Sequence, residues 1–212
     1  MQEKLKDKTK KILNILAEEY PDARCMLDHK TPLELLVATI LAAQCTDERV
    51  NMVTKDLFKK YRKAKDYAGA DLAELEEDIR PTGFFKNKAR SIKKASSDIV
   101  ERFGGKVPEN LKDLVSLPGV GRKTANVVLG TSFGKQGIIV DTHVKRVAGR
   151  IGLSKNTDPT KIEFDLMELV PERRWTEFSY ILTFHGRSIC VARKPRCEIC
   201  PINVLCDYYA SL

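Results

Sequence analysis

Apolar residues recur every three or four positions along most of the chain, which is the spacing of one face of an α-helix. One such stripe runs through Val50, Val53 and Leu57. Alternating patterns typical of half-buried strands are scarce. The pattern predicts helices over residues 32–43, from 46 onward, over 85–103, around 111–114, over 124–132 and over 159–169. We therefore predict an all-α protein.

Capping residues mark where several of these helices begin and end. Thr31-Pro32-Leu33-Glu34 has the form of a capping box with proline at the first helical position. Asp158-Pro159 marks another start, and Gly104-Gly105 ends the helix over 85–103. The apolar run 137–140 has no evident partner strand, so we expect an extended buried link there.

Composition and charge favour a folded protein with a polyanionic partner. The chain has 212 residues, of which 42% are hydrophobic, and a net charge of +8 from 37 basic and 29 acidic residues. An excess of this size is consistent with nucleic acid binding. The first residues are hydrophilic and no apolar run reaches membrane-spanning length, so we expect no membrane contact. The expected location is the cytoplasm, in association with the nucleoid.

The stretch 117–125 contains two glycines followed by a lysine near the start of a predicted helix. Glycine lets the backbone turn tightly, and a helix N-terminus favours an anion. The motif is too short for the phosphate loop of a nucleotide hydrolase. It suits one phosphate of a nucleic acid backbone, with the amine of Lys123 one turn away. A plain helix–turn–helix corner with a surface lysine is the alternative.

Four cysteines lie within seventeen residues near the C-terminus, with the spacing C-x6-C-x2-C-x5-C. Four thiolates this close need a shared positive centre. Structural zinc usually takes two short-spaced pairs separated by a dozen or more residues, so the compact spacing favours a [4Fe–4S] cluster. The predicted ligands are Cys190, Cys197, Cys200 and Cys206.

The loop between the first two of these cysteines is basic. It carries Arg193, Lys194 and Arg196, and Arg187 lies just before it. A solvated surface loop is one interpretation. A loop held at both ends by a metal centre would instead keep these cations ready for phosphates.

Together these motifs resemble the endonuclease III family, the iron–sulphur DNA glycosylase/lyases of the helix-hairpin-helix superfamily. The matching stretches run in family order from about residue 30 to 206: 41–44 with 46–47, 82–84, 117–125, 140–143, 185–187 and the cysteines. The resemblance implies two helical domains that flank a DNA-binding cleft. One is a six-helix domain with the helix-hairpin-helix motif at 25–136. The other is a discontinuous domain, 1–24 plus 137–212, with the cluster loop.

The resemblance also implies a catalytic pair, Lys123 and Asp141. A lysine at this position is typical of the bifunctional members, in which the amine displaces the damaged base and then cleaves the strand through a Schiff base. The positive end of the helix dipole disfavours an ammonium at Lys123, which favours the neutral nucleophile. Asp141 would accept a proton or stabilise the cation that develops at C1′. Because Asp141 precedes a helical stretch, it is also a candidate N-cap.

Further residues are expected to contact DNA. Gln44 matches the family residue that enters the gap left by the flipped base, although a polar helix terminus is the alternative. Phe84 stands where the family often carries a leucine wedge. Five cations of the helix over 85–103 are consistent with a solvated face. The remaining expected contacts are Leu117, Gly119, Val120, Gly121, Arg122 and His143, the last with a packing role as its alternative.

These expectations define a function and its alternatives. The predicted function is a bifunctional base-excision DNA glycosylase that removes oxidised or ring-saturated pyrimidines, with AP lyase cleavage by β-elimination. It would act as a monomer on double-stranded DNA containing damaged bases or abasic sites. The alternatives are a mismatch-type thymine or uracil glycosylase, and a non-catalytic DNA-binding iron–sulphur protein.

Overall fold

A computed structural model describes residues 2–212, and they form two compact units. One unit is Met26–Lys135, and the other joins Met1–Cys25 to Gln136–Leu212. Residues 2–212 form helices, turns and extended links, with no β-strand among them. The all-α prediction is confirmed. Of the helices in this range, none is both long and apolar enough to cross a membrane.

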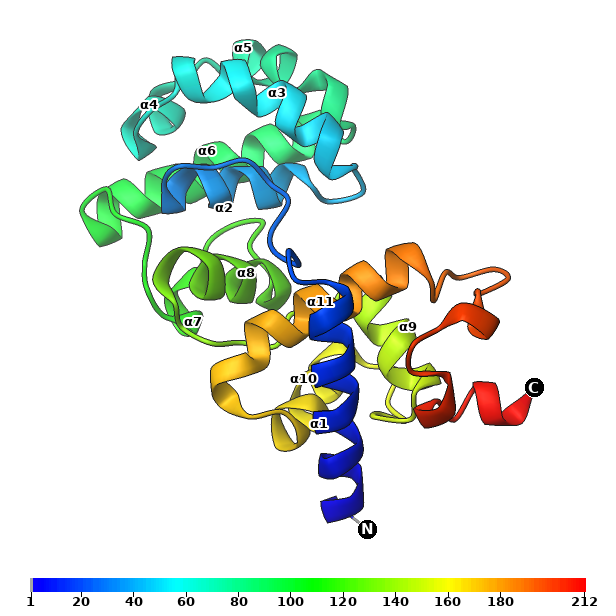
Figure 1. The fold of residues 1–212 in the computed structure, drawn as a ribbon. Helices are drawn as coiled ribbons and strands as arrows, with labels where there is room; N and C mark the ends of the chain where they lie inside the picture. The colour runs from blue at the N-terminus through cyan, green and yellow to red at the C-terminus, as the bar shows by residue number, and fades with distance from the viewer. Residues whose placement is uncertain (1) are drawn as a thin grey trace. The chain divides into compact units, whose positions relative to one another are not determined.

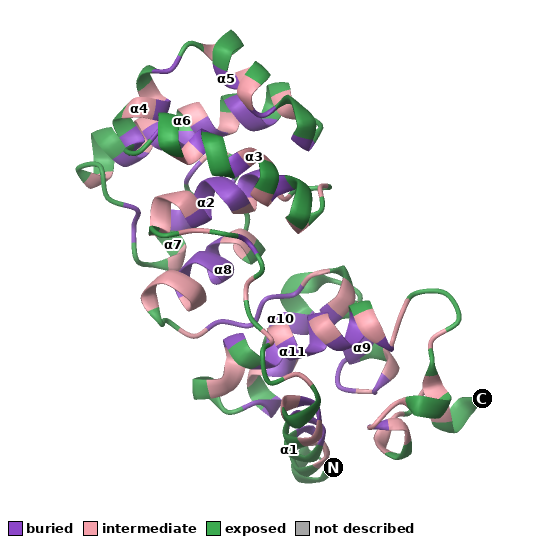
Figure 2. Ribbon diagram, turned by 45° about the horizontal axis from the view of Figure 1, so that its top comes forward, coloured by how far each residue is buried: buried purple, intermediate pink, exposed green. Residues whose placement is uncertain are grey.

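The unit Met26–Lys135 is built around α2, whose residues are apolar on nearly every side. Leu35, Leu36, Ala38 and Leu41 are at most 1% exposed. Helices α3, α6 and α8 pack against α2, which explains the purple, buried surface of this helix in Figure 2. The elements of this unit are α2 (Pro32–Leu41), α3 (Asp47–Lys60), α4 (Ala64–Gly69), α5 (Leu72–Asp78), the 3-10 turn η1 (Arg80–Thr82), α6 (Phe85–Phe103), α7 (Leu111–Val115) and α8 (Arg122–Phe133).

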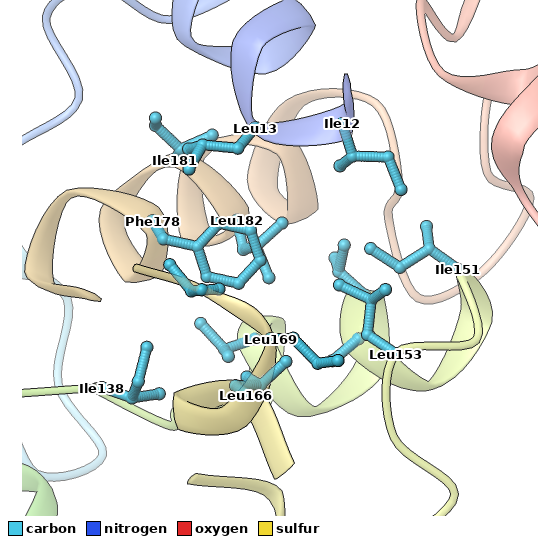
Figure 3. Packing of buried hydrophobic residues seen from close by; sticks show 14 of the residues in the cluster. Ile12, Leu13, Ile138, Ile151, Leu153, Leu166, Leu169, Phe178, Ile181 and Leu182 are labelled. Atoms are coloured by element: carbon cyan, nitrogen blue, oxygen red, sulfur yellow. The ribbon is translucent and has the colours of Figure 1, made fainter. Parts of the chain in front are cut away.

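The second unit surrounds one hydrophobic cluster, drawn in Figure 3. Phe178 and Leu182 are fully buried against Leu13 and Leu166, so chain segments from both ends of the sequence share this core. Burying each such side chain stabilises the fold by roughly 1.5–3 kcal/mol. The elements are α1 (Gln2–Glu19), α9 (Thr142–Arg150), α10 (Pro159–Leu169), the 3-10 turn η2 (Glu172–Arg174), α11 (Trp175–Ser188) and three 3-10 turns at Cys197–Ile199, Asn203–Leu205 and Tyr209–Ser211.

The predicted helix boundaries compare closely with the observed ones (Figure 1). The Thr31 side chain caps α2 by accepting from the Glu34 amide, and Asp158 caps α10 in the same way. Helix α6 has the predicted bounds and ends at Gly104 in the left-handed region. Helix α2 ends at Leu41, two residues earlier than predicted, because the chain turns there toward α3.

The apolar run 137–140 is the extended buried link that the sequence predicts. Its backbone amides find partners on α11 instead of on a neighbouring strand. The amide of Ile139 donates to Ser179 Oγ at 2.8 Å, and the amide of Gly137 lies 3.4 Å from Thr176 Oγ1. Both hydroxyl residues are buried, so they satisfy main-chain groups that water does not reach.

Candidate active site and metal centre

The glycine hairpin connects α7 to α8 within the unit Met26–Lys135. Leu117 and Val120 are 2% and 5% exposed, so their side chains anchor the hairpin in the core and only their backbone is left for a ligand. Gly119 has φ +79°, and a Cβ there would lie 2.6 Å from Ser91 Cβ on α6. Glycine is therefore required at 119 by backbone conformation and by space.

Lys123 is the second residue of α8 and is exposed. The helix begins after Gly121, which has no side chain to cap it. The first amides of a helix have no partner within the helix and suit an anion. The structure thus places an accessible amine in the first turn of a helix, directly after the glycine hairpin.

Asp141 lies in the other unit and is the N-cap of α9. Its Oδ1 accepts from the amides of His143 at 2.8 Å and Val144 at 2.7 Å. Its Oδ2 lies 3.4 Å from Thr183 Oγ1 on α11. The capping role predicted from sequence is confirmed. Because capping uses one oxygen, it holds the carboxylate in place and leaves the other oxygen less engaged.

His143 takes part in the packing of α9 against α11. Its Nδ1 lies 3.2 Å from Arg146 Nη2, which also donates to the Gly186 carbonyl at 2.8 Å. A Cβ at Gly186 would lie 2.9 Å from His143 Cβ, so the two helices meet closely at this glycine. The half-buried His143 therefore packs between α9 and α11, which the sequence analysis gave as the alternative to a DNA contact.

Gln44 and Phe84 share an unusual backbone conformation. Their φ angles are 55° and 48°, in the left-handed region that non-glycine residues seldom adopt. Both are exposed, and Phe84 is 64% exposed despite its apolar ring. Strain of this kind costs about 1–3 kcal/mol and concentrates at functional sites. The structure thus presents two exposed side chains on strained backbone, Gln44 in the turn between α2 and α3 and Phe84 directly before α6.

The four predicted ligand cysteines line one cavity in the second unit. Burial raises the pKa of the Cys200 thiol to about 11, and repulsion from thiolates at the other three cysteines adds to the increase. Burial and neighbouring thiols raise the pKa of Cys197 as well. Four mutually repelling sulphurs around a cavity match the donor set of an iron–sulphur cluster. Residues 2–212 contain no group of three His, Cys, Asp or Glu side chains placed for a single metal ion. The match between the cysteines and a cluster therefore rests on the cavity that all four of them line.

Two residues beside the cysteines were given no role from the sequence, although one of them lies in the family stretch 185–187. Arg150 on α9 donates from Nη1 to the Val191 carbonyl at 2.7 Å and lies 3.3 Å from Cys190 Sγ. His185 is 1% exposed, with Nε2 3.6 Å from Cys200 Sγ, and burial lowers its pKa to about 4. The sequence signal for Arg150 was weak, because its carbonyl partners lie about 40 residues away along the chain.

The basic residues Arg187, Arg193, Lys194 and Arg196 are all exposed. Lys194 has φ 53°. The Arg196 guanidinium donates back to the Ser188 carbonyl at the end of α11. Arg196 therefore helps to close the loop onto α11.

Comparison with known proteins identifies the family. The family model of the HhH-GPD superfamily base excision DNA repair proteins matches residues 37–172, and that of the iron–sulphur binding domain of endonuclease III matches residues 190–206. An endonuclease III from Synechocystis sp. is 54% identical over 202 residues, which is 95% of this chain and 92% of that protein.

Solved structures of endonuclease III have the same fold as this chain. The protein in a non-covalent endonuclease III–DNA complex has a TM-score of 0.93 and 44% identity, with 97% of each chain covered. The protein in a trapped endonuclease III–DNA covalent intermediate has a TM-score of 0.93 and 43% identity, with the same coverage. These matches favour endonuclease III over a mismatch-type glycosylase or a non-catalytic protein. The chain belongs to the endonuclease III family, and it is a base-excision DNA glycosylase with AP lyase activity that carries a [4Fe–4S] cluster.

Proposed function

We propose that Lys123 is the nucleophile of both reactions, and that the substrates are oxidised or ring-saturated pyrimidines and abasic sites in double-stranded DNA. The observation that carries this proposal is the exposed amine of Lys123 in the first turn of α8, directly after the glycine hairpin. A phosphate held by the hairpin would bring the sugar of a neighbouring nucleotide within reach of that amine.

The reaction begins when the neutral amine of Lys123 attacks C1′ of the flipped nucleoside. The bond between C1′ and the base breaks, and the base leaves with its electron pair and gains a proton. The sugar ring opens, and an imine joins Nζ to C1′. The imine acidifies the proton on C2′, and loss of this proton breaks the bond between C3′ and its phosphate oxygen. Water then releases Lys123 from the cleaved strand.

Asp141 is the second catalytic residue in this proposal. With Oδ1 held by two amides of α9, its carboxylate is fixed in orientation before DNA binds. It either accepts the proton that Lys123 loses or stabilises the positive charge that develops at C1′. Lys123 and Asp141 belong to different units, so the reaction requires both to reach the same nucleotide when DNA is bound.

The remaining predicted residues bind the DNA. We assign the hairpin (117–122) to one phosphate, Gln44 to the gap left by the flipped base and Phe84 to the opposite strand. His143 and the loop residues Arg187, Arg193, Lys194 and Arg196 are assigned to the backbone. The cluster, when bound, supplies iron–thiolate bonds that hold this loop. The enzyme would act as a monomer in the nucleoid.

Borohydride trapping on a duplex with one abasic site tests the nucleophile. Lys123→Gln should remove the covalent adduct and strand cleavage while DNA binding remains, because only the amine is lost. Lys112→Gln, an exposed lysine of α7, is the matched control and should trap normally. An adduct that persists in Lys123→Gln would show that another amine attacks. Faster base release from a thymine–guanine mismatch than from a ring-saturated thymine would refute the proposed substrate class.

A further inference from the structure

Lys88 is a charged side chain in an unusual place. It lies in the first turn of α6 and is 5% exposed, although lysine is seldom buried this fully. Neither the phosphate-binding hairpin nor the reaction at C1′ uses it. A buried amine is tolerated only where it has hydrogen-bond partners, so its partners indicate its role.

The Lys88 amine connects two segments that are far apart in sequence. Its Nζ donates to the Leu41 carbonyl at 2.7 Å and to the Thr82 carbonyl at 2.8 Å. Leu41 is the last residue of α2, where carbonyls have no partner within the helix. Thr82 is the last residue of η1. Both carbonyl oxygens must therefore lie within two hydrogen-bond lengths of each other.

The bridge does not depend on the charge of the amine. Burial lowers the pKa of Lys88, and the nearby Cys45 thiol acts in the opposite direction. A neutral amine still has two N–H groups, which is the number that the two carbonyls require.

The two bridged carbonyls lie two or three residues before the two residues with left-handed backbone described above. Gln44 follows Leu41 by three residues, and Phe84 follows Thr82 by two. The far end of each turn is also held. The Thr46 side chain caps α3 by accepting from the Arg49 amide at 3.3 Å. The Phe84 carbonyl accepts from the amide of Lys88 itself at 3.2 Å.

We propose that Lys88 is a positioning residue that holds the turns carrying Gln44 and Phe84 in a fixed relation, so that both side chains enter the duplex together. This inference rests on the roles proposed above for Gln44 and Phe84. Left-handed backbone at non-glycine residues persists only where the surroundings hold it, and the bridge fixes the entrance of both turns. In Figure 1, α6 runs beside α2, which allows one side chain of α6 to reach both carbonyls.

Lys93 provides a matched control within the same helix. Its Nζ also donates to two carbonyls, those of Ala68 at 2.8 Å and Ala70 at 2.6 Å. These carbonyls lie at the end of α4, away in sequence from Gln44 and Phe84. Lys88→Met and Lys93→Met each remove one amine and leave two carbonyls without it. Each change should destabilise the fold, but only Lys88→Met should disturb the two turns.

The experiment compares two DNA substrates under single-turnover conditions. The first is a duplex with one ring-saturated thymine, which must be opened by Gln44 and Phe84. The second is a single strand with one abasic site, which needs no opening and reports on Lys123 by borohydride trapping. We expect Lys88→Met to slow base removal from the duplex by about 100-fold, because small misplacements at a reacting centre have effects of that size. Trapping on the single strand should stay within about twofold of wild type, and Lys93→Met should stay within about twofold on both substrates.

A double-mutant cycle shows whether Lys88 acts through the two turns. In a Gln44→Ala/Phe84→Ala background, Lys88→Met should change base removal by no more than about twofold, since the side chains that it positions are absent. A full effect in that background, or equal duplex rates for Lys88→Met and Lys93→Met, would overturn the inference. If Lys88→Met does not fold, Lys88→Gln, whose shorter side chain cannot span both carbonyls, is measured against the same criteria. Absence of both activities in wild type would instead contradict the proposed function.

Discussion

Replacing Gly119 with alanine tests whether the hairpin depends on glycine in the way that its geometry indicates. An alanine would keep φ near +79°, in a region that costs an L-residue about 1–2 kcal/mol. Its Cβ would also lie 2.6 Å from Ser91 Cβ and 2.9 Å from Ser91 Oγ. Ser91 Cβ is bonded directly to the backbone of α6, so it cannot rotate away. The clash is therefore removed only if α6 or the hairpin shifts. Overpacking of this kind costs about 1–3 kcal/mol.

The two contributions together predict a loss of about 2–5 kcal/mol in the free energy of unfolding. For a chain of this length the loss corresponds to a fall in Tm of roughly 4–20 °C. Thermal and urea unfolding followed by circular dichroism measure it. Gly121→Ala is the control, since Gly121 has ordinary φ (−86°) and nothing lies within 4 Å of its added Cβ.

The backbone and the contact can be separated by a second substitution. Ser91→Gly removes the atoms that the new Cβ would meet, so Gly119→Ala in that background should cost only the backbone part, about 1–2 kcal/mol. If Gly119→Ala proves no more destabilising than Gly121→Ala, the reasoning from φ and contact distance is refuted. If Gly119→Ala costs as much stability in the Ser91→Gly background as in wild type, the contact part of the reasoning fails while the backbone part stands.

Three further outcomes are expected. Asp141→Asn should retain the cap of α9 and nearly all stability while lyase activity falls. Asp141→Ala should lose lyase activity and also about 1 kcal/mol of stability, because the cap is removed. Equal melting temperatures for the two variants would argue against the cap. Arg150→Met should hasten loss of the brown cluster absorbance in air, because the Arg150 guanidinium lies 3.3 Å from Cys190 Sγ; an unchanged rate of bleaching would contradict this. Arg174 lowers the pKa of Glu177, so this pair contributes stability above the ordinary pKa of a glutamate that is lost as pH falls through the lowered value. Glu177→Gln should therefore flatten the acid side of the Tm–pH curve, and an identical curve would show that the pair contributes nothing.

The parts of the site that could be predicted from sequence are those whose chemistry is local. The hairpin glycines and Lys123 lie within five residues, and the four cysteines lie within seventeen. Spacing alone therefore indicates a turn with an adjacent amine and a ligand set. Asp141 was predicted as an N-cap for the same reason, since capping joins a side chain to amides two and three residues ahead.

Helix α11 was not predicted, and its burial explains why. Most of its sides are covered, so Thr176, Ser179 and Thr183 are buried along with Phe178 and Leu182. Without a solvated face the helix has no apolar stripe that contrasts with polar positions. Its buried hydroxyls serve main-chain groups of the link 137–140 and of its own preceding turn, and no periodicity reveals such partners.

The charge of the α6 cations alone predicts that all of them are exposed, but their positions along the helix indicate otherwise for one of them. The sequence is consistent with five cations on a solvated face, and Lys86, Arg90 and Lys94, spaced by four residues, are indeed exposed. That interpretation is wrong for Lys88, which is buried, and incomplete for the half-buried Lys93.

Periodicity could have separated Lys88 from the exposed cations. Ile92, Ala95 and Ile99 follow it by four, seven and eleven residues, which is the spacing of a single helical face. A lysine in register with a buried stripe must either extend to solvent or find acceptors inside. Its position thus predicts a buried amine with partners. The identity of those partners, the carbonyls of residues 41 and 82, depends on how α2 and η1 pack against α6, which no local pattern encodes.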